Sequence, residues 1–363
     1  MDTLTSPVPG KDTPYPFAIT EYHDTPAIMK RLKNLIRMPI RGLNKAGVER
    51  YQTYFNTCCT HSKMQIDDAK KFIPGGVQHN LAFNHPFPLV FTKALGAHLW
   101  DLDGNRYIDF LQAGGPTLLG SNPAIVREKV IELLNTTGPV TGLFHEYELA
   151  LARKIVQYMP GVDMFRMLGS GTEADMAAIR IARLATQKKY ILKMGGAYHG
   201  WSDQLAYGIR LPGTRHMEAH GVPKNCFKYT QEFFPNEIAS LERKLWQNKF
   251  RGGTAAVIME PIGPESGTRP LNREFNAQVR ALCNQYGALL IFDEVVTAFR
   301  LGMGGAQGFF GVTPDLTVLG KIIAGGYPSA GGLGGKQEYM EYLAAGIQSG
   351  SKKALVGGTM AAN

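Results

Sequence analysis

The sequence has few cysteines and no long apolar run. Only four of its 363 residues are cysteine, and no CxxC pair occurs, which leaves no CxxC metal or redox site and favours a reducing compartment. No stretch approaches the roughly 18 to 20 consecutive apolar residues that a membrane helix needs. The first residues also lack the basic and then apolar pattern of a secretory signal. We therefore expect a cytoplasmic protein without a membrane partner.

Several catalytic and nucleotide-binding motifs are also missing. No GxxxxGK occurs, and Ala174 stands where a GxGxxG motif needs its third glycine, which argues against a nucleotide P-loop and a dinucleotide fingerprint. His145 and Glu146 begin a word that resembles HExxH, but Leu149 occupies the position of the second histidine. We therefore expect no metal site.

Acidic residues are outnumbered, with 39 Lys and Arg against 30 Asp and Glu and a formal charge of +9. The basic residues are mostly dispersed and are not interleaved with aromatic residues, so we expect no nucleic-acid partner. Residues 29–45 hold six basic residues and no acid. They form either a membrane-surface or partner helix or, as we favour, a helix with a solvated basic face that Pro39 interrupts. The proline-rich residues 1–26 predict a mobile tail or an arm that lies over another surface.

From about residue 72 onward, strand-like and helix-like segments alternate. Residues 96–111 alternate apolar and polar side chains on both sides of Asp103 and Gly104, which predicts a hairpin. Helix patterns are predicted at 123–136, 147–159, 173–185 and 273–286. Short apolar runs predict buried strands at 163–168, 189–194, 254–260, 288–295 and 315–320. Apolar strands separated by helices are typical of an α/β fold with a mainly parallel sheet between layers of helices.

Small and polar residues follow each predicted strand. In a parallel sheet, ligands bind beyond the carboxyl ends of the strands, so these residues are candidates for a site. In chain order they are Gly169, Ser170, Gly171 and Thr172, then Gly196 to His199, then Glu260, then Asp293 and Glu294, and finally Lys321. We expect all of them to meet at one edge of the sheet.

Each candidate has an ordinary interpretation as well as a functional one. The loop at 169–172 precedes a helix, where free N–H groups favour an anion, although its two hydroxyls could simply cap the helix. Asp293 ends an apolar run and needs a partner there, either a cationic ligand or an arginine such as Arg300. Lys321 is either a lysine that reaches water or an amine that its surroundings keep uncharged for Schiff-base chemistry.

Taken together, the candidates fit one ligand. Pyridoxal phosphate requires an anion site for its phosphate, a carboxylate for its ring nitrogen, an amine for its aldehyde and a packing surface for its ring. The chain offers all four, with Tyr198 as an aromatic packing surface. The sequence therefore predicts this cofactor.

Seven motifs, in matching order, resemble the class III aminotransferases of the fold-type I pyridoxal-phosphate enzymes. They are DLDGNRYIDF, GSGTEADMAAIRIAR, GGAYHGWSD, IMEPIG, GALLIFDEVVTAFR, GVTPDLTVLGKIIAGGYPSAGGLGG and GGTMAAN. The similarity begins at about Asp68 and is strongest to glutamate-1-semialdehyde aminomutases and beta-amino-acid aminotransferases. It implies an N-terminal extension at 1–66, a segment with the hairpin at 67–112 and a large cofactor-binding domain at 113–363, without the C-terminal domain of the relatives.

The resemblance also implies roles for individual residues. Lys321 would form the Schiff base with the cofactor and carry a proton between substrate and cofactor. Asp293 would keep the pyridine nitrogen protonated, and Val295 and Tyr198 would pack the two faces of the ring. The other implied cofactor-binding residues are Ser170, Gly171, Thr172, His199 and Glu260, with Thr359 reaching the phosphate of a neighbouring subunit in a homodimer with shared active sites.

Three positions depart from the aminomutase pattern. Leu81 stands about where an arginine would receive a substrate carboxylate, residues 113–116 replace an SWGP sequence, and Glu265 replaces an asparagine beside the cofactor hydroxyl. These departures concern the substrate and not the cofactor. We therefore expect an aminotransferase that moves an amino group from an amino acid or amine to a keto or aldehyde acceptor. An aminomutase is the alternative, ahead of a non-catalytic scaffold with the same fold.

Overall fold

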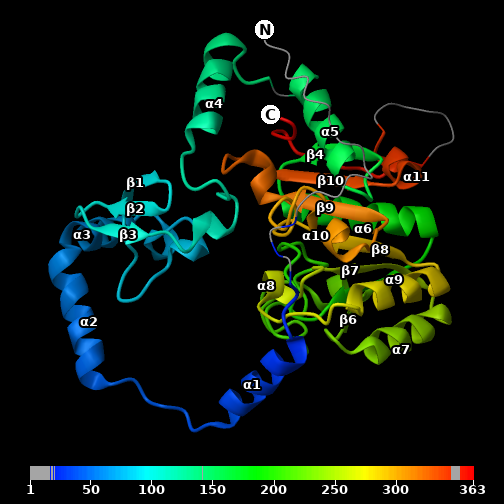
Figure 1. Cartoon of the computed structure of the whole chain (residues 1–363), viewed down its shortest axis with the longest axis horizontal. Coiled ribbons are helices and arrows are strands. Elements are labelled where there is room, and N and C mark those ends of the chain that lie inside the picture. The colour runs from blue at the N-terminus through cyan, green and yellow to red at the C-terminus, as the bar shows by residue number, and fades with distance from the viewer. Residues whose placement is uncertain (1–16, 18, 20, 141, 345–351) are drawn as a thin grey trace. The chain divides into compact units, whose positions relative to one another are not determined.

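A computed structural model of the chain describes residues 17, 19, 21–140, 142–344 and 352–363 (Figure 1). The chain divides into two compact units. The large unit combines Met1–Ile28 with Pro139–Asn363, and the small unit is Met29–Gly138. Within the described ranges, no helix has both the length and the apolar character needed to cross a membrane.

A seven-stranded sheet forms the centre of the large unit. Its strands lie in the order β4-β10-β9-β8-β7-β5-β6. β10 is antiparallel to both of its neighbours, and the other six strands run in one direction, so the sheet is mainly parallel as predicted. The bounds are β4 (Met164–Leu168), β5 (Tyr190–Met194), β6 (Thr230–Phe233), β7 (Thr254–Met259), β8 (Leu289–Asp293), β9 (Leu316–Gly320) and β10 (Gly331–Gly335).

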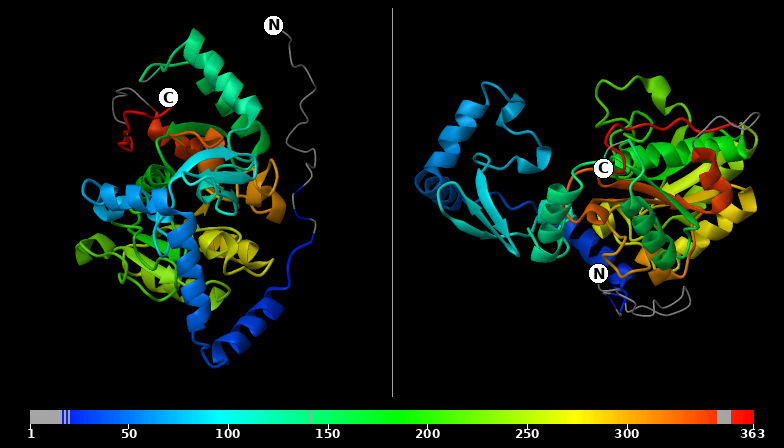
Figure 2. Two further views of the ribbon diagram at one scale, coloured as in Figure 1. Left: turned by 90° about the vertical axis from the view of Figure 1, so that its left-hand side faces the viewer. Right: turned by 90° about the horizontal axis from the view of Figure 1, so that it is seen from above.

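Helices cover both faces of this sheet (Figure 2). Successive residues of a strand point to opposite faces, and in β7 Ile258 packs on one face while Val257 and Met259 pack on the other. α6 covers the first face, and α7 and α9 cover the second. The helices of this unit are α5 (Glu146–Tyr158), α6 (Gly171–Thr186), α7 (Ile238–Lys249), α8 (Pro264–Gly267), α9 (Phe275–Tyr286), α10 (Gly305–Phe310) and α11 (Gln337–Met340).

The five predicted strands of the large unit form, and two further strands, β6 and β10, are not evident from the sequence pattern. β10 has the sequence GGLGG, which reads as a loop. Its glycines are required by space: a Cβ on Gly331 would lie 2.4 Å from the backbone of Ser170, and a Cβ on Gly332 would lie 2.5 Å from the ring of Phe165. A strand with side chains at these positions would therefore not fit.

The small unit contains a three-stranded antiparallel sheet in the order β1-β2-β3. The predicted hairpin is confirmed, because β2 and β3 pair with His98 opposite Ile108 on either side of the turn at Asp103 and Gly104. The bounds in this unit are α2 (Lys45–Cys58), α3 (Thr60–Ala69), β1 (Phe91–Leu95), β2 (His98–Asp101), β3 (Arg106–Ile108) and α4 (Ala124–Thr136), with α1 (Thr25–Arg37) crossing the unit boundary.

The hairpin turn anchors the start of α3. The carboxylate of Asp103 accepts hydrogen bonds from the backbone N–H groups of His61 (2.7 Å) and Ser62 (3.0 Å) and from the Ser62 hydroxyl (2.7 Å). The residue before the helix provides no side-chain cap of its own, so Asp103 satisfies N–H groups that would otherwise lack a partner. Burial would raise the pKa of Asp103, but these hydrogen bonds lower it to about 2.

The start of the described chain, through the first residue of α1, packs against the rest of the large unit. The hydroxyls of Tyr22 and Thr25 donate hydrogen bonds to the carbonyl oxygen of Leu271 at 2.7 and 2.9 Å. The ring of Phe17 meets that of Phe309 edge-on, with centroids 5.5 Å apart. The described part of residues 17–28 is therefore an arm on the large unit, while most of the predicted tail lies outside the described residues.

The basic segment at 29–45 is helical up to Arg37, which both interpretations from the sequence require, and the choice between them stays a prediction. α1 ends at Arg37, two residues before Pro39, and the six basic side chains of the segment are exposed. The apolar side chains of Leu35 and Ile36 on α1 are exposed as well.

Candidate active site

The carboxyl ends of the parallel strands lie at one edge of the large-unit sheet. The side chain of Val295 lies there, close to the predicted anion loop and to the residue before Lys321. A Cβ on Gly171 would lie 2.8 Å from Cγ2 of Val295, and a Cβ on Gly320, just before Lys321, would lie 3.0 Å from Cγ1. Val295 itself comes two residues after Asp293, at the end of β8. The predicted anion loop, the lysine and the aspartate are therefore brought together around one side chain.

The loop between β4 and α6 leaves donors at the start of the helix. Ser170 is the N-cap residue, and its hydroxyl accepts a hydrogen bond from the N–H group of Glu173 at 3.3 Å. The first N–H groups of a helix have no partner inside the helix and carry partial positive charge. Thr172 lies against Gly200, where a Cβ would come within 2.1 Å of the Thr172 hydroxyl oxygen. The loop thus caps the helix, as the ordinary interpretation predicts, and also presents donors to an anion.

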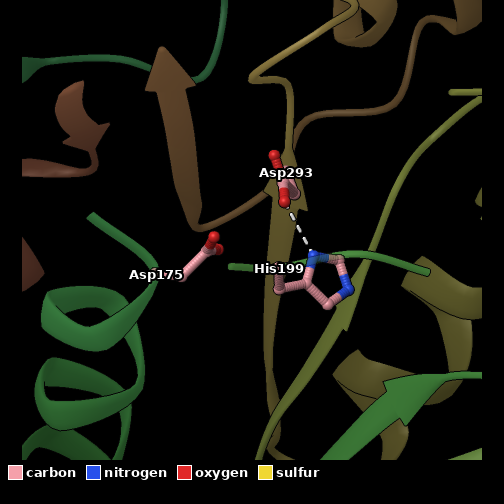
Figure 3. A group of neighbouring side chains, drawn as sticks. All are labelled: Asp175, His199 and Asp293. Carbon is pink, nitrogen blue, oxygen red and sulfur yellow. Dashed lines mark hydrogen bonds and ion pairs between the residues drawn. The ribbon is translucent and has the colours of Figure 1, made fainter. Parts of the chain in front are cut away.

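A buried aspartate and histidine form the second part of the site (Figure 3). Asp293 is 4% exposed, and its Oδ2 binds Nδ1 of His199 at 2.7 Å, while Oδ1 accepts the N–H group of Val295 at 3.0 Å. Burial lowers the pKa of His199, so its imidazole is neutral. A neutral imidazole with its proton on Nδ1 donates that proton to Oδ2 of Asp293. Each oxygen of Asp293 retains a lone pair for a further donor.

Glu260, directly after β7, ties two loops together. Its Oε1 accepts the N–H groups of Tyr198 (2.9 Å) and Glu265 (3.0 Å), and its Oε2 accepts the N–H group and the hydroxyl of Ser266 (3.1 Å for the hydroxyl). Glu265 and Ser266 have φ values of 48° and 56°, in the left-handed region that side chains disfavour. Burial, together with the charge of Asp293, raises the pKa of Glu260 to about 7. Glu260 therefore holds the Tyr198 loop and a strained loop in place.

Lys321 follows β9 directly and begins a short 3-10 helix, η5 (Lys321–Ala324). Its φ of 46° is also in the left-handed region, and the residue is partly buried. Its positive charge acts on the carboxyl group of Asp175 at the start of α6. Strained backbone at a chemically capable residue supports a functional role for Lys321.

The structure leaves two predicted roles open. Tyr198 is 47% exposed, and its backbone rather than its ring makes the contact with Glu260. Thr359 is exposed, and the preceding Gly358 lies beside Glu173 of the same chain, where a Cβ would be 3.0 Å from the carboxylate. The contact of Thr359 with a neighbouring subunit stays a prediction.

In the small unit, two of the three departures from the aminomutase pattern lie side by side. A Cβ on Gly114 would come 2.9 Å from Cδ1 of Leu81. The two positions at which the resemblance implies an arginine and an aromatic residue in an aminomutase are therefore neighbours, and here they are leucine and glycine.

Two buried charged residues of this region are not singled out by the strand-end pattern. Asp175 lies near the start of α6, and Lys193 lies inside β5. Lys193 is completely buried, and its Nζ donates hydrogen bonds to the carbonyl oxygens of Ala197 and Gly208, which fastens the loop that carries His199. The available signal was a charge at an apolar position: Asp175 is among the alanines of α6, and Lys193 interrupts the run YILKM.

Donor atoms of Asp175, His199 and Asp293 all lie within 4.8 Å of one another, a spacing that a metal ion can accept. His199 and Asp293, however, already bind each other through the 2.7 Å hydrogen bond between Nδ1 and Oδ2. The chemistry of this group therefore favours hydrogen bonding.

Known proteins resemble the chain in sequence and in structure. The family model Aminotransferase class-III matches residues 81–363. Glutamate-1-semialdehyde 2,1-aminomutase 1 from Lachnoclostridium phytofermentans is 41% identical over 313 residues, which cover 82% of this chain and 72% of that protein. An omega-transaminase from Sphaerobacter thermophilus has a TM-score of 0.76 and 31% identity, covering 85% of this chain and 71% of that one. A transaminase with PLP bound has a TM-score of 0.75 and 28% identity, covering 84% and 70%.

These similarities confirm the fold and the cofactor expected from the sequence. A mainly parallel sheet with helices on both faces is the α/β arrangement of the fold-type I transferases. Its edge provides the helix N-terminus, the buried carboxylate and the lysine that pyridoxal phosphate requires. The chain therefore belongs to the class III aminotransferases, the pyridoxal-phosphate-dependent enzymes of fold type I.

Proposed function

We propose that this chain is an aminotransferase in which Lys321 holds pyridoxal phosphate as a Schiff base and Asp293 binds its ring nitrogen. The observation that carries the proposal is the arrangement around Val295, which adjoins both Gly171 at the start of α6 and Gly320 before Lys321. One side chain thus joins an anion-binding helix end, a buried acid and an amine.

The residues present fit this cofactor. The N–H groups at the start of α6, with the hydroxyls of Ser170 and Thr172, suit the phosphate. Asp293 is buried and retains acceptor capacity, which suits a protonated ring nitrogen. Among the described residues, Oδ1 of Asp175 is a buried oxygen without a hydrogen-bond partner, so the region has polar capacity that the protein alone leaves unused. Val295 and Tyr198 are the candidates for the two ring faces.

The bound cofactor would supply an aldehyde that accepts an amine and a ring that takes up the electron pair when a bond at the substrate α carbon breaks. Lys321, once freed by the substrate amine, would take the proton from that carbon and deliver it to the cofactor side of the carbon–nitrogen double bond. Asp293 would hold the ring nitrogen in its protonated form by accepting its N–H group. The Nδ1–H group of His199 orients Asp293, and Glu260 fixes the backbone at Tyr198.

For the substrates, we propose an amino acid or amine as donor and a keto or aldehyde compound as acceptor. The contact between Leu81 and Gly114 supports this choice, because both groups by which an aminomutase would bind its substrate are changed at adjoining positions. The 41% identity to an aminomutase supports intramolecular amino transfer as the second candidate.

We propose further that the enzyme is a homodimer with shared active sites, in which Thr359 contacts the phosphate bound by the neighbouring subunit. The exposure of Thr359 leaves it available for that contact. The four cysteines are free thiols, which supports placing the enzyme in a reducing cytoplasm.

The test is covalent trapping of the cofactor. We expect the chain loaded with pyridoxal phosphate to absorb visible light, and borohydride to fix the cofactor on the peptide that contains Lys321. Lys321→Ala should abolish fixation, and the exposed Lys352→Ala serves as the matched control. Fixation on another lysine would contradict the proposed role. A separate assay with an amine donor should require an added keto acid, and turnover without any acceptor would favour the aminomutase.

A further inference from the structure

Asp175 is a buried carboxyl group to which the proposed reaction assigns no task. It lies near the start of α6, 1% exposed, beside the buried Ala174 and Ala178. Its Oδ1 has no hydrogen-bond partner in the part of the chain that the structure describes. A buried polar group without a partner is destabilising, so a carboxyl group at this position is not explained by packing.

Polar groups of the candidate active site lie near Asp175. Ligand atoms of Asp175, His199 and Asp293 lie within 4.8 Å of one another, and Figure 3 shows the carboxyl group of Asp175 extending from α6 toward Asp293. A single water molecule spans a separation of this size with two hydrogen bonds. Asp293 therefore lies within reach of a proton on Asp175 through one such water molecule.

The surrounding charges favour the protonated form of Asp175. Burial, and then the negative charges of Asp293 and Glu260, raise the pKa of Asp175 well above its ordinary value, against the opposing effect of Lys193 and Lys321. Asp175 thus retains its proton at pH values where an exposed aspartate has lost it. The uncharged imidazole of His199, which faces the same cluster, does not offset the two negative charges.

We propose that Asp175 is a positioning residue, a neutral carboxylic acid that donates a hydrogen bond to Asp293 through one bridging water molecule. This bond stabilises the negative charge of Asp293 and directs its free lone pair toward the ring nitrogen of the cofactor. Asp175 acts through Asp293 and does not itself touch the reacting atoms. The inference rests on the proposed function, because only a cofactor-binding Asp293 needs such support.

The first test uses the chain without cofactor and compares it with Asp175→Asn, which has the same shape and can donate but cannot ionise. A carboxyl group whose pKa is higher in the folded chain makes stability fall as the pH rises above the ordinary value near 4. We therefore expect the urea midpoint of Asp175→Asn to rise relative to that of the wild type between pH 4 and pH 8. A difference that stays constant over this range would overturn the neutral-acid assignment, independently of any cofactor.

The second test measures pyridoxal-phosphate binding at pH 7 by equilibrium dialysis and by the visible absorbance band. Asp175→Asn should bind within about threefold of the wild type, whereas Asp175→Leu, which has no donor, should bind roughly tenfold more weakly or worse, the size of one hydrogen bond to a charged group. The absorbance of the wild type should also change with pH as Asp175 ionises, and that change should be missing from Asp175→Asn. The urea midpoint of Asp175→Leu at pH 7 checks that this variant is folded.

The outcomes separate the two proposals. Equal binding by the wild type and a folded Asp175→Leu would overturn the role of Asp175 and leave the proposed function intact. Weak binding by both variants would also overturn it, because the Asn variant keeps the donor. No binding by the wild type would overturn the proposed function, and the role of Asp175 with it.

Discussion

Gly331 of β10 gives the sharpest test of how the fold builds the candidate active site. It pairs with Leu168 of β4 on one side and with Gly320 of β9 on the other. A Cβ at this position would lie 2.4 Å from the N, C and O atoms of Ser170, the residue that caps α6. We predict that Gly331→Ala both destabilises the large unit and displaces the loop that presents donors to the phosphate.

The magnitude follows from the contact. Ordinary van der Waals contacts of a Cβ begin near 3.4 Å, so the methyl group overlaps three backbone atoms by about 1 Å. Overpacking of this kind costs about 1 to 3 kcal/mol. We expect the upper end, about 3 kcal/mol, because hydrogen bonds to both neighbouring strands oppose a shift of β10. For a unit of this size, that loss lowers the melting temperature by roughly 6 to 12 °C.

The assay compares Gly331→Ala with Gly357→Ala, a glycine whose added Cβ would meet no atom within 4 Å. Denaturant unfolding gives the stability, and equilibrium dialysis gives the affinity for pyridoxal phosphate. The control should remain within about 0.5 kcal/mol of the wild type. If Gly331→Ala matched the control in both measurements, the close approach of β10 to Ser170 would not exist in solution and the reasoning would be refuted.

Two further predictions concern carboxyl groups. Burial raises the pKa of Glu260 to about 7 from 4.5, so its ionisation makes the wild type less stable as the pH rises from 4.5 through 7, by up to about 3 kcal/mol. Glu260→Gln cannot ionise, so urea unfolding should show that its stability relative to the wild type is higher at pH 8 than at pH 5. Parallel pH profiles of the two proteins would contradict this. Asp103→Ala should destabilise the chain by about 1 to 2 kcal/mol, because the start of α3 loses its acceptor. The exposed Asp68→Ala is its control in the same unfolding assay, and equal midpoints for the two variants would show that Asp103 caps nothing.

The parallel strands and the position of the candidate site follow from the sequence because both depend on local signals. A strand buried on both faces needs a continuous apolar run, and the residue after the run must tolerate the edge of the sheet. Asp293 and Lys321 are conspicuous for this reason, since each ends an apolar run with a charge. The hairpin at Asp103 and Gly104 is evident for a similar reason, because the turn needs specific residues.

The features that the sequence does not reveal depend on what lies across the fold. β10 consists of glycines because Phe165 of β4 and Ser170 of the loop after β4 leave room only for glycine there. A run of glycines looks like a loop until those neighbours are known. Lys193 satisfies its buried Nζ with carbonyl oxygens up to fifteen residues away in the chain, at Gly208. The role of Asp175 can be inferred only from its proximity to Asp293, which is more than a hundred residues further along the chain.

The buried charged residues lie around the candidate active site. Glu260, Lys193 and Asp175 are each costly to bury, and a chain selected for stability alone would replace them with apolar side chains. Glu260 and Lys193 both fasten the loop that begins at Gly195, and Asp175 lies beside the acid that the loop's histidine supports. The cost of burial therefore falls on residues that fix the positions of Tyr198 and Asp293. This cost of burial is expected for a site that holds a cofactor ring in one orientation. We therefore predict that removing the side chain of Glu260, Lys193 or Asp175 will change cofactor binding more than removing a charged side chain on the surface.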